Sequence, residues 1–257
     1  MLRKGDLTQG GIITTLLQFT LPMLAGSLLQ QCYNIADTLI VGQCIGANAL
    51  AAVGSAYTLM VFLISILLGL SMGSGTVFSL QYGAGDLSAL RRSIYVSLLL
   101  IGTVTILLNV AVFLWLDPIL RWLQVPYDIY SLMRNYLWII FWGIVFTFLY
   151  NFYAALLRAV GDSVTPLWFL AVSVVLNIGL DLFLILVLDQ GIEGAAVATV
   201  IAQGTAASGI LLYTYKTRPE LRLHREDMCF DRSSLREITS FSTLTCVQQS
   251  VMNFGIL

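Results

Sequence analysis

Charged side chains are the scarcest feature of this chain, at 11% of its 257 residues. A soluble domain carries about 25% charged residues, whereas hydrophobic residues here reach 58%. A water-soluble fold of this size could not bury so much apolar surface, so the composition excludes an ordinary soluble domain. The few charges form no strongly basic patch, and we therefore expect no nucleic-acid partner.

Histidine and cysteine are also rare. The single histidine, His224, lies in a polar stretch, and neither HExxH nor GxSxG occurs. None of the four cysteines stands at CxxC spacing, and cysteine within apolar runs usually behaves as a small hydrophobe. Zinc and Ser-His chemistry are excluded on these grounds. We expect no enzyme activity, no cofactor, no resident metal and no disulfide framework.

Long apolar runs are what the chain has in abundance. A spanning helix needs about 20 mostly apolar residues. Seven segments meet that length, at 13–40, 49–80, 93–116, 130–157, 165–188, 192–214 and 237–257. They predict an all-α, polytopic membrane helical bundle with a six-helix N-terminal lobe (1–214), a cytoplasmic connecting loop (215–236) and an incomplete seventh span (237–257).

The distribution of basic residues predicts the orientation. With a cytoplasmic N-terminus, all but two of the 13 lysines and arginines fall on the cytoplasmic side, and only Arg121 and Arg134 fall outside. We therefore expect a multi-pass protein of the cell (inner or plasma) membrane with the lipid bilayer as its surroundings. The seventh segment reaches Leu257 without closing polar residues, so we also expect a longer parent protein. A natural truncation and a gene fragment remain open.

Two carboxylates lie inside predicted spans, where a charged side chain costs about 2.5–3.5 kcal/mol on insertion scales. Asp37 follows Asn34 by three residues, and Asp181 follows Asn177 by four, so each pair shares one helix face. A carboxylate with an amide oxygen suits a small hard cation or a proton relay. The alternative interpretation is that each aspartate caps or solvates a helix end near the interface.

The case for a transport role is weaker for the other polar residues of the predicted spans. Hydrogen bonding between helices explains any one of them as well as transport does. They are Tyr136, Thr147 and Asn151 in the fourth segment, and Thr199 and Gln203 in the sixth. Pro22, inside the first segment, either makes a static kink or lets the helix bend during a transport cycle.

Three blocks of sequence resemble the multidrug and toxic compound extrusion (MATE) family. Their order and spacing both fit, and together they cover essentially the whole chain. They are 21–42 (LPMLAGSLLQQCYNIADTLIVG), 158–181 (beginning RAVGDSVTP and ending LNIGLD) and 191–199 (GIEGAAVAT). The resemblance implies twelve spans in two lobes and export of cationic or amphipathic compounds in exchange for Na⁺ or H⁺. This chain matches only the first lobe, the connecting loop and most of the seventh span.

The resemblance also implies roles for particular residues. An acidic cluster of the family's N-terminal lobe matches Asp37, Tyr136, Asn151, Asn177, Asp181 and Thr199, and Pro22 matches a proposed helix bend. We expect Asp37, Asn177, Asp181 and Thr199 to handle the coupling ion, with transient Na⁺ binding there as one form. Asn34, Tyr136 and Asn151 would support them as polar groups of the cavity. Two adjacent carboxylates also disfavour double ionisation, so a proton switch is the other form.

Several alternatives remain at this stage. One is export of a lipid-linked or oligosaccharide precursor, although the predicted membrane interior contains almost no Arg or Lys. Another is a non-transporting membrane scaffold. The family binds its small substrates between two lobes, so transport by this chain would require the missing second lobe or a second copy. Cargo, coupling ion and oligomeric state are not determined by the sequence.

Overall fold

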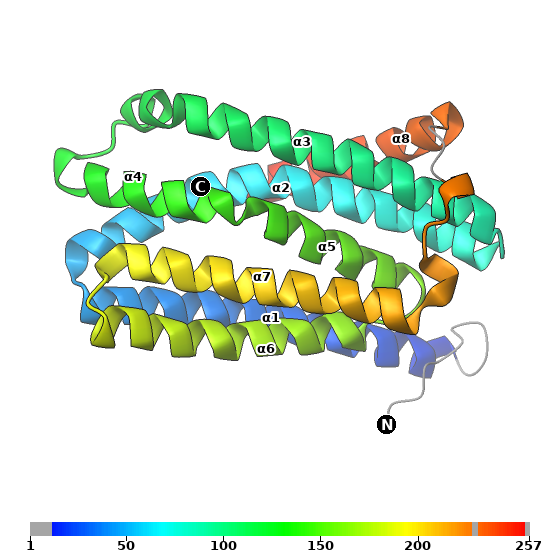
Figure 1. The fold of residues 1–257 in the computed structure, drawn as a ribbon, viewed down its shortest axis with the longest axis horizontal. Helices are drawn as coiled ribbons and strands as arrows, with labels where there is room; N and C mark the ends of the chain where they lie inside the picture. The colour runs from blue at the N-terminus through cyan, green and yellow to red at the C-terminus, as the bar shows by residue number, and fades with distance from the viewer. Residues whose placement is uncertain (1–11, 228–230, 255–257) are drawn as a thin grey trace.

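A computed structural model describes residues 12–227 and 231–254, which form a bundle of helices joined by short turns (Figure 1). The long helices are α1 (Ile12–Cys44), α2 (Ala47–Gly83), α3 (Leu87–Trp122), α4 (Tyr127–Trp142), α5 (Ile144–Ala159), α6 (Val164–Leu182), α7 (Gly191–Thr217) and α8 (Arg232–Phe254). A π-helical turn, η1 (Phe183–Val187), prolongs α6, and two 3₁₀ turns, η2 (Pro219–Leu221) and η3 (Arg225–Asp227), lie between α7 and α8.

The helices pack in two groups with a bent span between them. In Figure 1, α1, α6 and α7 lie together on one side, and α2, α3 and α8 lie on the other. The α4–α5 pair runs between the groups and contacts both α2 and α7. The turns between α2 and α3 and between α5 and α6 lie at the same end as residues 218–227, and we call this the linker end (Figure 1).

Five of the seven predicted spans are apolar and long enough to cross a membrane. Four are the single helices α2, α3, α6 with η1, and α7; the fifth is the bent pair α4–α5. The helices of the first and seventh predicted spans, α1 and α8, do not meet the same standard within the described residues. Both carry many polar side chains, among them Gln30 and Gln31 in α1 and Gln248 and Gln249 in α8.

The fourth span is broken rather than continuous, which corrects the single segment predicted at 130–157. Its halves meet at Gly143 with a bend of 47°. Asn109 of α3 donates from Nδ2 to the Phe141 carbonyl oxygen at 3.0 Å, so it satisfies an acceptor beside the break. A side chain at Gly143 would meet Val200 of α7, since an ideal Cβ would lie 2.8 Å from its Cγ2. Close packing on α7 therefore accompanies the bend.

Glycine and aspartate shape both turns at the linker end. Gly85 and Gly161 adopt φ of 74° and 85°, a region that favours glycine because it lacks a Cβ. Asp86 accepts the Ala89 backbone N–H at 2.9 Å, which caps α3. Each turn therefore combines a helix stop and a helix start within a few residues.

The polar stretch predicted as a loop at 215–236 is partly helical. α7 continues to Thr217 and α8 begins at Arg232, so the connection narrows to 218–231. Asp231 accepts from the Ser233 and Ser234 backbone N–H groups, both at 3.1 Å, at the start of α8. This cap explains why α8 begins five residues before the predicted seventh span at 237.

α8 packs closely along α2. A side chain at Gly69 or Gly73 would overlap the backbone of Cys246 or Ser242, so both glycines permit the helices to touch. Thr245 donates its hydroxyl to the Gly69 carbonyl oxygen at 2.7 Å. These small residues therefore let α8 pack directly against α2.

Candidate functional site: a buried carboxylate pair beside a polar cavity

A cavity of about 860 Å³ opens among the spans. Its lining comes from α1, α2, α4, α5, α6 and α7, with Gln249 from α8. Four tyrosines line it: Tyr33, Tyr57, Tyr136 and Tyr150. Asp37 is the one charged residue among the described residues of its wall, where no lysine, arginine or histidine occurs. The cavity is therefore aromatic and weakly acidic.

Asp37 and Asp181 meet in the interior although they are far apart in sequence. α1 packs against α6, and the two carboxylates come within hydrogen-bonding reach of each other. Asp37 is 8% exposed and Asp181 is 0% exposed. Each has an Oδ1 atom that no described residue hydrogen-bonds. Two carboxylates that are this close together and this well shielded from water cannot both stay charged unless a proton or a cation lies between them.

Asn177 and Thr199 hold Asp181 in place. With its nitrogen toward the carboxylate, the Asn177 amide donates to Asp181 Oδ2 at 2.9 Å, and its oxygen accepts the Thr199 backbone N–H at 3.3 Å. The opposite orientation lets Nδ2 reach only the Thr199 hydroxyl, at 3.4 Å, and turns the amide oxygen toward the carboxylate. The first orientation is the better assignment because it gives both the nitrogen and the oxygen of the amide a hydrogen-bond partner.

Tyr33 and Tyr136 complete the surroundings of the pair. The Tyr33 hydroxyl lies 3.3 Å from Thr199 Oγ1, which links α1 to α7. Tyr136, from α4, is buried within the electrostatic range of Asp37, Asp181 and Tyr33. Tyr33 was not among the site residues predicted from the sequence. Its position one helical turn before Asp37, on the same face, is the signal that could have found it.

Two of the predicted cavity residues hydrogen-bond to groups other than the carboxylates. Asn151 donates from Nδ2 to the Thr147 carbonyl oxygen at 2.8 Å, and the Thr147 hydroxyl donates to Gln203 Oε1 at 2.6 Å. Asn34 is half-buried and donates to Gln31 Oε1 at 3.2 Å. All of these residues line the cavity. They form separate polar patches rather than part of the carboxylate cluster.

Neither aspartate caps a helix end. Asp37 lies within α1, which continues to Cys44, and Asp181 is followed by Leu182 and the π-helical turn η1. The Leu188 N–H bonds the Phe183 carbonyl at 3.2 Å across that turn. π-helical turns occur frequently at functional sites. Pro22 lies inside α1, which continues as a helix through it although proline cannot donate to the Gln18 carbonyl.

Fold and site together define an α-helical, multi-pass membrane protein with a buried carboxylate pair. The profile of the MatE family matches residues 22–183, which is more than half of the chain. The chain belongs to the MatE family.

Curated relatives agree with that assignment. The chain is 37% identical to the probable multidrug resistance protein YpnP of Bacillus subtilis, over 82% of this chain and 47% of that protein. It is 28% identical to the multidrug export protein MepA of Staphylococcus aureus, over 95% of this chain and 54% of that protein. The chain thus spans about half the length of the curated relatives that it matches.

Solved structures show the same fold. A MATE protein in complex with MaD5 superposes with a TM-score of 0.91 at 22% identity, covering 100% of this chain and 58% of that one. A transporter of the MOP superfamily from Pyrococcus furiosus gives a TM-score of 0.90 at 23% identity, covering 98% of this chain and 56% of that one. At these identities the likeness concerns the fold.

Proposed function

We propose that this chain is the ion-coupling part of a secondary active antiporter that exports cationic or amphipathic compounds in exchange for H⁺ or Na⁺. The observation that carries the proposal is the Asp37–Asp181 pair, buried beside the cavity with an unsatisfied oxygen on each carboxylate. The whole transporter needs a second lobe or a second copy of this chain. Its place is the cell membrane, with the N-terminus and the linker end on the cytoplasmic side.

Protonation supplies the simplest switch at this pair. One proton shared by the carboxylates removes their mutual repulsion and lets α1 and α6 stay together. Loss of that proton favours any arrangement in which Asp37 and Asp181 separate. An ion can shift such an equilibrium only by its differential affinity for the two arrangements.

Sodium could use the same residues after a local rearrangement. Hard cations prefer oxygen ligands, and Asp37, Asp181 and Thr199 supply carboxylate and hydroxyl oxygens. The Asn177 amide, whose orientation is assigned from its hydrogen bonds, would offer its oxygen to a cation when turned the other way. The same residues therefore suit either coupling ion.

The cavity wall favours a cationic cargo. Tyrosine rings attract cations through their π faces, and Asp37 adds negative charge. A lipid-linked precursor carries phosphate, which calls for arginine or lysine, and neither lines the described cavity. The curated relatives named above are multidrug resistance and export proteins, in accord with the same cargo class.

Export of a fluorescent cationic dye into the lumen of everted vesicles, whose cytoplasmic face is outside, tests the proposal. The 257-residue chain is compared with a version completed by the second lobe of a MatE relative, with pH and Na⁺ gradients imposed separately. We expect dye movement from the completed protein, driven by one of the gradients and abolished by Asp181→Asn.

The matched control is Asp189→Asn, which makes the same chemical change at an exposed turn. Asp189 has a φ of 52°, a conformation that asparagine tolerates well. Unchanged gradient-driven efflux in Asp181→Asn would refute the coupling role. A completed protein that moves no dye but still binds partners would favour the scaffold alternative.

A further inference from the structure

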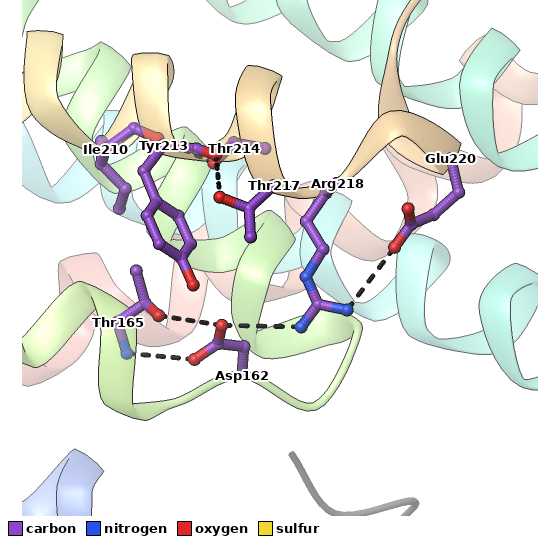
Figure 2. Close-up of polar contacts among 8 residues, drawn as sticks. All are labelled: Asp162, Thr165, Ile210, Tyr213, Thr214, Thr217, Arg218 and Glu220. Carbon is purple, nitrogen blue, oxygen red and sulfur yellow. Dashed lines mark hydrogen bonds and ion pairs between the residues drawn. The ribbon is translucent and has the colours of Figure 1, made fainter. Parts of the chain in front are cut away.

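The turn between α5 and α6 carries a buried carboxylate with partners on two sides. Asp162 is 9% exposed and accepts both the Thr165 backbone N–H, at 3.0 Å, and the Thr165 hydroxyl, at 2.9 Å. Its Oδ2 also lies 3.5 Å from a terminal nitrogen of Arg218, the residue directly after α7 (Figure 2). Asp162 thus joins the start of α6 to the start of the linker.

Arg218 has a second partner within the linker itself. Its other terminal nitrogen lies 3.5 Å from Glu220 Oε1, on the side away from Asp162 (Figure 2). Its Nε is buried without a hydrogen bond to any described residue. The contact with Asp162 is single rather than bidentate, and the Thr165 bonds of Asp162 do not depend on it. The two residues can therefore separate while each keeps a polar partner.

A second arginine holds the far end of the same segment. Arg91, near the start of α3, lies with Nε 3.0 Å from Asp227 Oδ2 and donates to the Glu220 carbonyl oxygen at 3.5 Å. Asp227 also accepts the His224 backbone N–H at 3.0 Å. This ion pair is shorter than the one at Asp162 and Arg91 reaches two points of the linker, although its Nε, like that of Arg218, makes no hydrogen bond of good geometry to a described residue.

An apolar side chain anchors the middle of the segment. Leu221 is 5% exposed and belongs to the main hydrophobic core, and Leu223 packs against that core. Residues 218–227 are thus docked along the linker end, although their polar sequence predicted a loop. α8 begins shortly after, at Arg232.

We propose that residues 218–227 form a brace between helices α1–α7 and α8. The Arg218–Asp162 contact is its releasable latch, and the Arg91–Asp227 contact holds its far end. While the latch is closed, the segment before α8 stays against the α5–α6 turn. When Arg218 leaves Asp162 for Glu220, the first part of the brace lifts away from the α5–α6 turn, while Leu221 and the Arg91–Asp227 contact keep the rest in place. This inference does not depend on what the protein transports.

Hydrogen exchange of the purified chain in detergent tests the latch. The variants are Arg218→Gln, Asp162→Asn and the double variant, since asparagine keeps an oxygen for the Thr165 N–H but loses the charge. The amides of Leu221 and Arg222, which bond within η2, report on the brace. Each single variant should speed their exchange by about threefold to tenfold, with little further gain in the double variant.

Two further variants distinguish loss of the Arg218–Asp162 contact from a general loss of stability. Lys216→Gln removes the same charge at an exposed position in the last turn of α7, and it should leave the brace unchanged. Arg218→Lys keeps the charge and should restore part of the protection. Additive effects of the two single variants, or an acceleration by Lys216→Gln equal to that of Arg218→Gln, would overturn the latch.

Discussion

The seam between α2 and α8 gives the sharpest test of how α8 is held. An alanine at Gly69 would place its Cβ 2.5 Å from the Cys246 Cα and 2.7 Å from its sulfur. Carbon atoms settle at about 3.5–4.0 Å, so α8 would have to move away by about 1 Å. Backbone atoms cannot turn aside as a side chain can, and the whole helix must therefore shift.

The expected cost follows from two opposing effects. Overpacking of a close contact destabilises by about 1–3 kcal/mol, and an overlap with backbone, which cannot rotate away, costs about 2–3 kcal/mol of that range. Replacing a helical glycine by alanine returns about 1 kcal/mol of backbone preference. If the Gly69 carbonyl moves away, the single Thr245 hydroxyl proton can turn to the Phe241 or Ser242 carbonyl, so this loss adds little. We expect Gly69→Ala to weaken the docking of α8 by about 1–2 kcal/mol, a factor of about 5–30 in the opening equilibrium.

Maleimide labelling of Cys246 measures that opening. The Cys246 thiol donates to the Ile66 carbonyl oxygen at 3.4 Å within the seam, and the other cysteines are replaced by alanine for the assay. Gly69→Ala should label about 5–30 times faster than the parent protein. Gly75→Ala is the matched control, because its Cβ would meet Ala155 Cβ at an ordinary 3.4 Å. Equal labelling rates in the two variants would refute the close-packing argument.

Three further predictions concern the broken span and the brace. Asn109→Leu leaves the Phe141 carbonyl without its donor and should lower the stability of the protein in detergent by about 1 kcal/mol, measured by denaturant titration against Asn48→Leu at an exposed site. Gly143→Val should destabilise more than Gly102→Val, because an added Cβ meets Val200 Cγ2 at 2.8 Å but only Phe148, at 3.9 Å, in the control. Burial raises the pKa of Asp227, but the His224 N–H and the Arg91 charge outweigh it and hold the pKa below its usual value. Its contribution to stability is therefore complete above the unfolded pKa and is lost as pH falls through the folded one, so Asp227→Asn should lower the melting temperature at neutral pH, and this effect should shrink as pH falls below the ordinary aspartate pKa of about 4.

Much of the fold could be predicted because membrane helices are encoded locally. Apolar runs of sufficient length indicated the spans, and the structure has a helix or a bent pair for each. The family resemblance, drawn from blocks such as 158–181, is confirmed by the MatE match over residues 22–183. The break at Gly143 was missed, since one glycine in an apolar run is an ambiguous signal. It is decided by Val200 and Asn109, which lie far away in the sequence.

The site was only partly accessible from the sequence. Burial of a carboxylate is expensive in any membrane protein, so Asp37 and Asp181 stood out without knowledge of the fold. Helical spacing paired Asp37 with Asn34, yet Asn34 bonds Gln31, and the residue beside the pair is Tyr33. Spacing identifies a face of one helix, but it does not say which part of that face meets a neighbouring helix.

The sequence by itself determined that this protein crosses a membrane with helices and buries two carboxylates, because apolar length and the cost of buried charge act within one segment. Only the tertiary structure decided that the carboxylates meet, that Asn177 lies between Asp181 and Thr199, and that residues 218–227 dock against the helices. Those outcomes depend on distances between helices. Such distances are set by the packing of residues that are remote in the chain, such as Gly69 against Cys246, and no local pattern records them.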